Sequence, residues 1–191
     1  MKVGIVGCGP AGLFTAYELS HNSGIEVFVL EQGPDVEKRK SLLHGVGGAG
    51  TYSDGKINVH PQIGGDLYNF LPRDEAWALL YKLEAKFRQL GVTGEFEMNE
   101  EKERKIKAFQ ELAGRNGIEF LPYKTIHVGT DRLPEIISGF KRELMAGGVT
   151  FQLATQVVEI LPPEGRTSQR LLVRNEAAKT KELRSVVTPL A

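Results

Sequence analysis

The sequence of 191 residues predicts an α/β fold, and three observations support this class. The chain opens with an apolar run, a glycine-rich turn and a helix-forming stretch that leads to a second apolar run. Two helical patterns occupy the middle of the chain. A β-branched alternating stretch, a turn and a further apolar stretch lie near its C-terminus.

The opening stretch has the order strand, glycine turn, helix, strand. Lys2–Val6 is short and apolar, as buried parallel strands are, and Ala11–Ser20 is rich in helix formers. Between them, Gly7 permits a tight turn, Gly9 lets the backbone approach a pyrophosphate, and Gly12 lets the helix close on the strand. Phosphates would face free N–H groups at the positive end of the helix. This order predicts a dinucleotide-binding turn.

Glu31 ends the second apolar run, nineteen residues after Gly12. A carboxylate at about this spacing typically accepts hydrogen bonds from adenosine ribose hydroxyls and repels a 2′-phosphate, which favours NAD or FAD over NADP. Cys8 lies inside the turn, and we interpret it as a small side chain that fits there. Because it is the single cysteine, the chain forms neither an intrachain disulfide nor a redox dithiol.

The composition indicates which kinds of partner and which cellular location to expect. The 24 basic and 24 acidic residues cancel, so no electrostatic reason favours nucleic acid or an anionic membrane. No apolar run is long enough to span a bilayer, and Pro10 and Glu18 interrupt the N-terminal one. We expect a cytoplasmic protein that acts on a small molecule, with no nucleic-acid or membrane partner. No cluster of His, Cys and carboxylates has metal-ligand spacing, so no metal is expected.

The middle of the chain predicts two helices. Arg73–Leu90 places apolar residues at helical spacing. Asn99–Asn116 is more charged, with Asn99 as its expected N-cap and Gly117 as its stop. Ile118–Leu121 is a short apolar run that follows.

The C-terminal third predicts one more helix and then strands. Thr130 is the expected N-cap of this helix, which ends at Gly147–Gly148. Val149–Ile160 alternates and is β-branched, so we read it as a strand. Pro162–Gly165 is a turn from which Leu171–Arg174 returns, as in a β-hairpin or the start of a meander.

A second glycine loop, from Gly45 to Gly55, is too small and polar to be a regular element. Five glycines between Gly45 and Asn58 cost chain entropy unless the backbone must approach something closely. From Gly50 the loop nearly matches a Walker A motif, but Ile57 replaces the Ser or Thr that would hold magnesium. We therefore interpret it as a loop that lines a cofactor, with a flexible surface loop as the alternative.

These motifs resemble those of known flavoproteins. Gly7–Gly12 with Ala16 and Glu31 resembles the N-terminal part of FAD-binding oxidoreductases with the glutathione-reductase-like fold. More narrowly, the chain resembles a family of largely uncharacterised bacterial and archaeal FAD-dependent dehydrogenases at Gly47–Asn58, Gly64–Gly65 and His127–Arg132. The resemblance runs from the N-terminus to about residue 160.

The resemblance implies FAD as cofactor, with NAD(P)H as a candidate electron donor. It implies that the pyrophosphate and ribose contact the first motif, that the second loop lies beside the ribityl chain and flavin ring, and that a later strand offers backbone groups to the adenine. The residues so implied are Gly7, Gly9, Pro10, Ala11, Gly12, Glu31, Gly48, Ala49, Gly50, Thr51, Ser53 and Val157.

The chain differs from these flavoproteins in its length. They continue through further motifs that hold the ribityl chain and second phosphate, whereas Ala191 stands about where the first of these is expected. We therefore expect a C-terminally incomplete FAD-binding Rossmann-like domain, residues 1–60 and 126–191, completed by a missing C-terminal half or a separate subunit. Residues 61–125 form a helical insertion that serves as a cap or substrate region.

Three residues are candidates for catalysis. Lys56 would stabilise negative charge on reduced flavin, or be a solvated lysine. Asp54 would act as a base, or form a turn before Gly55. His127 would transfer a proton, or cap a helix. The sequence thus predicts an FAD-dependent oxidoreductase or its FAD-binding part. An NAD-binding dehydrogenase without flavin and a truncated, non-catalytic nucleotide-binding chain stay open.

Overall fold

The computed structural model describes residues 1–93, 99–162, 169–175 and 180–185. The chain divides into two compact units. The first unit is Met1–Gly55 together with Thr130–Ala191, and the second unit is Lys56–Gly129. Both glycine loops lie in the first unit, so that unit contains the predicted cofactor-binding residues.

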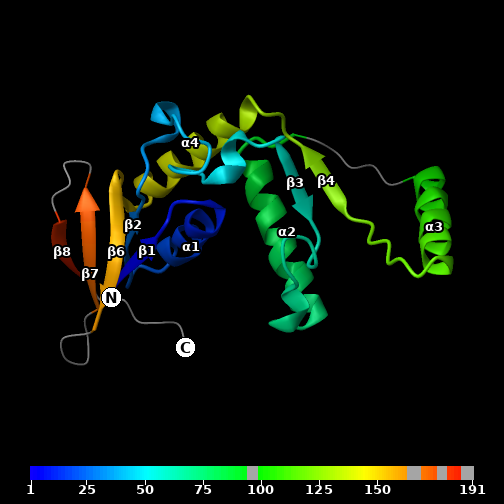
Figure 1. Cartoon of the computed structure of the whole chain (residues 1–191), viewed down its shortest axis with the longest axis horizontal. Coiled ribbons are helices and arrows are strands. Elements are labelled where there is room, and N and C mark those ends of the chain that lie inside the picture. Colours follow the sequence, from blue (N-terminus) through cyan, green and yellow to red (C-terminus); the bar gives the residue numbers. More distant parts are fainter. Residues whose placement is uncertain (94–98, 163–168, 176–179, 186–191) are drawn as a thin grey trace. The chain divides into compact units, whose positions relative to one another are not determined.

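A parallel sheet forms the centre of the first unit (Figure 1). Its strands are β1 (Lys2–Val6), β2 (Glu26–Leu30) and β5 (Thr150–Gln152), in the order β1-β2-β5. Ile5 pairs with Val29, which pairs in turn with Phe151. The predicted strand at Lys2–Val6 is confirmed, and the parallel strands end at the same edge of the sheet.

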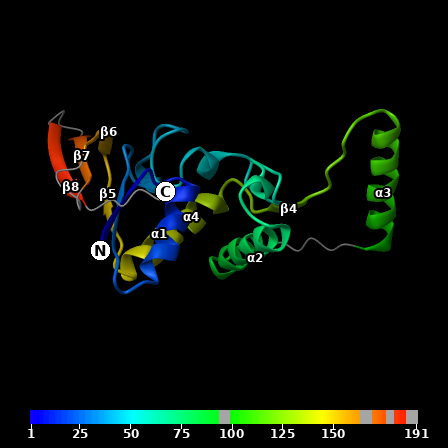
Figure 2. The same ribbon diagram turned by 90° about the horizontal axis from the view of Figure 1, so that it is seen from below.

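The parallel sheet is covered on both faces, as Figures 1 and 2 show. On one face lie α1 (Pro10–Ser20) and α4 (Arg132–Ala146), joined by an edge-to-face contact between Phe14 and Phe140 at 5.2 Å. On the other face lies an antiparallel sheet of β6 (Thr155–Leu161), β7 (Gln169–Asn175) and β8 (Thr180–Ser185).

A small apolar cluster packs the parallel sheet against the antiparallel sheet. Its buried members are Phe28 and Leu30 of β2 with Leu171 and Val173 of β7, and Val157 packs against them. Because side chains alternate along a strand, the intervening residues of β2 face the helices instead. A near-continuous apolar run is therefore needed in β2, which explains the pattern seen in the sequence.

The structure corrects the prediction of one strand over Val149–Ile160. This stretch forms β5 and β6 in different sheets, and Ala154 between them has a positive φ of 49°. The Ala154 N–H donates to the Gly33 carbonyl at 3.0 Å, which turns the chain away from the parallel sheet. Alternation along the sequence continues across this bend, so it conceals the break.

The strands β6, β7 and β8 form an antiparallel meander, which contains the expected hairpin. Leu171–Arg174 falls inside β7, which pairs with β6 as predicted, and β8 adds the third strand. The predicted turn at Pro162–Gly165 lies largely outside the described residues. The predicted N-cap of α4 is wrong, because Asp131 rather than Thr130 precedes the first helical residue and makes no side-chain capping bond.

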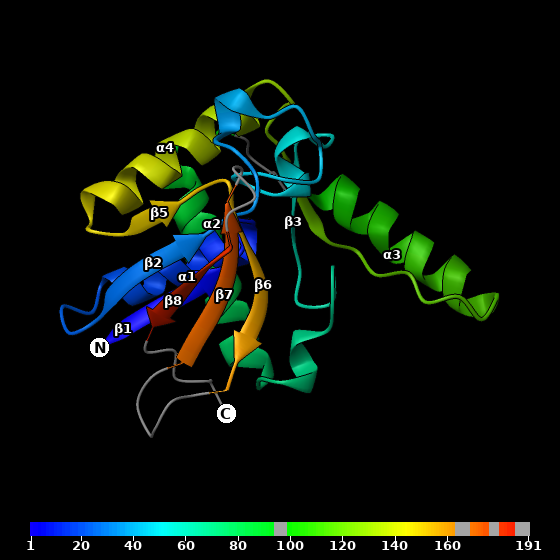
Figure 3. The same ribbon diagram turned by 60° about the vertical axis from the view of Figure 1, so that its left-hand side comes forward.

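The second unit contains two helices and a strand pair (Figure 3). The helices α2 (Arg73–Gln89) and α3 (Glu100–Arg115) confirm both predicted helices. Asn99 caps α3 by accepting a hydrogen bond of 2.9 Å from the Lys102 N–H, and Gly117 follows with a φ of 68°.

The strand pair of the second unit was not predicted. It consists of β3 (Lys56–Val59) and β4 (Lys124–His127), which are antiparallel. The apolar run Ile118–Leu121 lies outside any strand. Both strands are short and mostly polar, so neither carries a clear β pattern, and a contact across 65 or more residues of chain creates them.

Candidate dinucleotide site

The turn between β1 and α1 requires glycine at two positions. Gly7 has a φ of 96°, a conformation that L side chains rarely adopt. A Cβ on Gly12 would lie 2.0 Å from the Gly7 carbonyl oxygen, so a side chain there would force the helix away from the strand. As the motif predicts, Gly7 permits the tight turn and Gly12 permits the close packing of the helix on the strand.

Gly9 is different, because its surroundings are open. A Cβ added to Gly9 would meet no heavy atom of the described residues within 4 Å, and the backbone at this position is extended. Its glycine is thus not required by the protein's own packing. Space above the N-cap of α1 is what a pyrophosphate approaching the backbone would need.

The helix start supplies donors to that space. The first hydrogen bond of α1 runs from the Leu13 N–H to the Gly9 carbonyl at 3.0 Å. The N–H groups of Ala11 and Gly12 precede it and have no intrahelical acceptor, as in any first turn. Pro10 at the first helical position has no N–H to satisfy. These features fit a bound phosphate.

Glu31 is buried, with 6% of its surface exposed, and its carboxylate joins three loops. One oxygen, Oε2, accepts from the Cys8 N–H at 2.8 Å. The other, Oε1, accepts from Gly33 and Gly45 N–H groups at 2.8 and 3.0 Å. Since a carboxylate has about four acceptor positions, about one is left for a ribose hydroxyl. Glu31 is therefore a structural anchor as well as a candidate ribose ligand.

The second glycine loop lies directly against the first. The Gly47 N–H donates to the Cys8 carbonyl at 2.7 Å. A Cβ on Gly48 would lie 3.1 Å from the Gly9 Cα. Ala49–Tyr52 forms one 3₁₀ turn, so the expectation of no regular element here is corrected at these residues. The two loops form one continuous glycine-lined surface.

Thr51, in that 3₁₀ turn, carries an unsatisfied hydroxyl. The residue is 1% exposed, and among the described residues its Oγ1 has no hydrogen-bond partner. An unpaired buried hydroxyl costs free energy in the empty protein. A Cβ on Gly47 would lie 2.0 Å from this oxygen, so the hydroxyl is directed at the backbone of the second glycine loop.

Arg39 fastens the second loop. Its guanidinium donates to the Val46 and Gly48 carbonyls at 2.9 and 2.8 Å and lies 5.0 Å from the centre of the Tyr52 ring. Arg39 has no local signal in the sequence, because it stands in a run of charged residues that is typical of a solvated surface. Only the folded loop shows that its partners are carbonyl groups.

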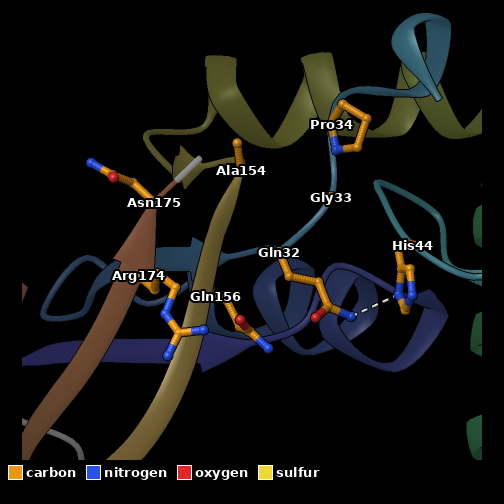
Figure 4. A pocket seen from close by; sticks show the side chains of 8 residues that line it. All are labelled: Gln32, Gly33, Pro34, His44, Ala154, Gln156, Arg174 and Asn175. Atoms are coloured by element: carbon orange, nitrogen blue, oxygen red, sulfur yellow. Dashed lines mark hydrogen bonds between the residues drawn. The ribbon is translucent and has the colours of Figure 1, made fainter. Parts of the chain in front are cut away.

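A pocket of about 360 Å³ opens beyond the end of β2 (Figure 4). Gln32 Nε2 and His44 Nδ1 form a hydrogen bond of 2.8 Å at its wall, while Gln156 and Arg174 are neighbours on β6 and β7. Amide groups pair well with the edge of an adenine. The full lining is Gln32, Gly33, Pro34, His44, Ala154, Gln156, Arg174 and Asn175.

Of the remaining predicted cofactor residues, one packs against the apolar cluster and three are exposed in the second glycine loop. Val157 packs its side chain into the apolar cluster, and its neighbour Gln156 lines the pocket instead. Gly50 and Ser53 are exposed in the second loop, where Ser53 Oγ donates to the Gly50 carbonyl at 2.8 Å. Ala49 is also exposed.

The catalytic candidates include one pair that the fold brings together. Lys56 on β3 and His127 on β4 are directly opposite each other in the strand register, although 71 positions separate them in the sequence. Both are exposed, as is Asp54 in the first unit. Their roles in a reaction stay predictions.

Cys8 is fully buried within the first turn. Burial and the nearby Glu31 carboxylate raise the pKa of its thiol to about 12. The thiol is therefore neutral at physiological pH and unsuited to nucleophilic or redox chemistry. Its role is to fill space beneath the turn, as the sequence analysis proposed.

The described residues also bear on metal sites and membrane spans. No group of three or more His, Cys, Asp or Glu residues in the described ranges could hold a metal ion. None of the described helices has the length and apolar character needed to span a membrane.

Comparison with known proteins identifies the first motif. Residues 5–37 match the NAD(P)-binding Rossmann-like domain family. No curated protein matches the chain in sequence.

Solved structures resemble the whole chain. THI4 from Thermovibrio ammonificans has 15% identity over 97% of this chain and 54% of its own, with a TM-score of 0.51. CabE, an aromatic hydroxylase from angucycline biosynthesis, has 16% identity over 96% and 29%, with a TM-score of 0.49. A flavoprotein/dehydrogenase from Cytophaga hutchinsonii has 13% identity over 96% and 37%, with a TM-score of 0.46.

The chain spans less than two thirds of the length of each of these three proteins. Of these three structures, THI4 has a TM-score above 0.5. The first unit thus has an α/β fold with a Rossmann-like dinucleotide-binding motif at residues 5–37.

Proposed function

We propose that this chain is the FAD-binding part of an FAD-dependent oxidoreductase that acts by hydride transfer through flavin N5. The observation that carries the proposal is the contact between the two glycine loops, where Gly47 donates to the Cys8 carbonyl and Gly48 approaches Gly9. A glycine turn at a helix start suffices for a pyrophosphate. The second loop extends the same surface, which suits a longer cofactor.

The chain's own residues would bind the cofactor in segments. The N–H groups of Ala11 and Gly12 and the positive end of α1 would hold the pyrophosphate. The remaining acceptor position of Glu31 would take a ribose hydroxyl. The amide groups of Gln32 and Gln156 would face the adenine in the pocket beyond β2.

The second loop would bind the middle of the cofactor. Thr51 gains a partner for its buried hydroxyl if a ribityl oxygen reaches it, and Ser53 has an exposed hydroxyl in the same loop. FAD, when bound, supplies a hydride acceptor, which no side chain offers. The backbone of Val157 stays a candidate adenine contact.

Proton handling would fall to the candidates already named. An imidazole and an ammonium on neighbouring strands suit general acid–base work, so we propose His127 and Lys56 as that pair. Asp54 is the alternative base. NAD(P)H is the proposed electron donor.

A second candidate is an NAD-binding dehydrogenase without flavin. The domain match favours it, because the matched family is described as NAD(P)-binding. A nucleotide-binding chain without turnover is the third candidate.

The deciding experiment is absorbance of the purified protein between about 350 and 500 nm, where bound flavin absorbs. Colourless protein would then be titrated separately with FAD and NADH. Flavin absorbance, or FAD uptake that Gly9→Ala weakens, supports the proposal. Tight NADH binding without FAD uptake replaces it with the second candidate, and turnover by the flavin-loaded chain excludes the third.

A further inference from the structure

The second unit contains a pocket of about 560 Å³ that the dinucleotide site does not use. All of its lining residues lie between Lys56 and Gly129, at the end of β3, on α2 and α3, and just before and at the start of β4. Its volume falls within the range of small-molecule sites.

Aromatic side chains form one wall of this pocket. Trp77 and Tyr81 are four residues apart and share a face of α2, with ring centroids 5.8 Å apart and a tilt of 32°. His60 meets the Trp77 ring edge to face at 5.3 Å. Tyr81 is 60% exposed, so its ring is not consumed by core packing. The wall therefore offers ring surface to a ligand.

The charges around the pocket balance. Glu84, one turn beyond Tyr81, accepts hydrogen bonds from Lys124 and from Arg88, the latter at 2.9 Å. The other lining charges are Glu103 and Lys107 on α3. Two carboxylates and two ammonium groups line the pocket, so their charges cancel. This balance favours an uncharged ligand.

We infer that the second unit binds a neutral, planar aromatic molecule of one or two rings, which stacks on Trp77 and Tyr81. Offset and edge-to-face contacts between rings add to the burial of apolar area. This binding does not depend on a dinucleotide in the first unit. That the molecule is the substrate rests on the proposed function.

The test uses coumarin as the probe and octahydrocoumarin, which has the same skeleton without an aromatic ring, as the matched control. Both are titrated by calorimetry into the full chain without FAD. Trp77 is the single tryptophan, so its emission reports on the pocket directly. We expect coumarin to bind at least about tenfold more tightly than octahydrocoumarin and to change the Trp77 emission.

Variants distinguish binding in this pocket from nonspecific hydrophobic binding elsewhere on the chain. Tyr81→Leu and Trp77→Leu should each weaken coumarin binding by about tenfold. Phe70→Leu removes an aromatic ring of the same unit that is 81% exposed and outside the lining, and should change nothing. Circular dichroism confirms that each variant is folded, and Tyr81→Leu carries the test if Trp77→Leu is not.

Three outcomes would overturn the inference: no coumarin binding at millimolar concentration, equal binding of the two probes, or equal weakening by Phe70→Leu. Failure of FAD to bind in a separate titration would overturn the proposed function and leave this inference standing. Failure of coumarin to bind would overturn this inference and leave the proposed function standing.

Discussion

Glu31 Oε2 accepts a hydrogen bond of 2.8 Å from the backbone N–H of Cys8, which links the end of β2 to the glycine turn after β1. The residue that sequence spacing marks as a candidate ribose ligand therefore also holds the glycine turn in place. Since Gly33 and Gly45 donate to the same carboxylate, the side chain also ties the turn to the segments at Gly33 and Gly45.

The first prediction concerns this anchor. Glu31→Gln replaces one acceptor oxygen with an amide NH₂, so at least one of three backbone N–H groups loses its partner. We expect the protein without cofactor to be destabilised by about 1–3 kcal/mol in urea unfolding. Glu26→Gln disrupts only the exposed ion pair with Lys2 and should change stability by less than about 1 kcal/mol. Equal effects of the two variants would contradict the anchoring role.

The second prediction separates two glycines of the first motif. Gly9→Ala places a methyl group in open space, so thermal stability should be unchanged while dinucleotide affinity falls. Gly12→Ala places it against the Gly7 carbonyl oxygen and should cost about 2 kcal/mol or more. Thermal unfolding and FAD titration check both. Weak cofactor binding without loss of stability in Gly12→Ala would refute the assignment.

The third prediction uses the unsatisfied hydroxyl of Thr51. Thr51→Val keeps the branched shape and removes a buried oxygen without a partner, so the protein without cofactor should be as stable as wild type or up to about 1 kcal/mol more stable. FAD affinity should fall, because a cofactor partner for the hydroxyl is lost. Calorimetric unfolding and FAD titration give the two readouts. A destabilised variant would show that the hydroxyl has a structural partner.

The fourth prediction is that Cys8 does not react in the folded protein. With its pKa raised to about 12, chiefly by burial, almost no thiolate forms at pH 8. A disulfide reagent such as 5,5′-dithiobis(2-nitrobenzoate) should therefore release one equivalent of chromophore per chain only after denaturation. Rapid labelling of native protein would contradict the buried position.

The fifth prediction concerns pH and Glu84 in the second unit. Burial opposes ionisation of Glu84, but hydrogen bonds and charges from Lys124 and Arg88 outweigh it and lower its pKa below the ordinary 4.5. The stabilisation is thus fully present above pH 4.5 and is lost as pH falls through the lowered value.

Trp77 emission during acid and urea titration follows this unit. Glu84→Gln should reduce stability at pH 7 by about 1–2 kcal/mol and weaken the dependence on pH below 4.5. Glu101→Gln, in the exposed pair with Lys105, is the matched control and should leave the acid dependence unchanged.

Local patterns predicted much of the secondary structure. The strand at Lys2–Val6, the helices from Pro10, Arg73 and Glu100, and the Asn99 cap all follow from short-range periodicity or capping chemistry. The split of Val149–Ile160 did not follow, because a hydrogen bond to the distant Gly33 carbonyl decides it.

Some residues of the candidate site could likewise be predicted from local patterns, and others could not. Gly7, Gly12 and Glu31 were marked by motif spacing, whereas Arg39, Gln32 and Arg174 lacked a local signal. An arginine in a charged run is read as surface until the loop carbonyls that it binds are known.

The sequence by itself determined the Rossmann-like turn, because glycine geometry and strand and helix patterns act over a few residues. Only the tertiary structure decided that Glu31 joins three loops, that the second glycine loop contacts the first, and that Lys56 faces His127. These relationships join residues far apart in the chain, and they depend on hydrogen bonds and packing that exist only once the backbone has folded.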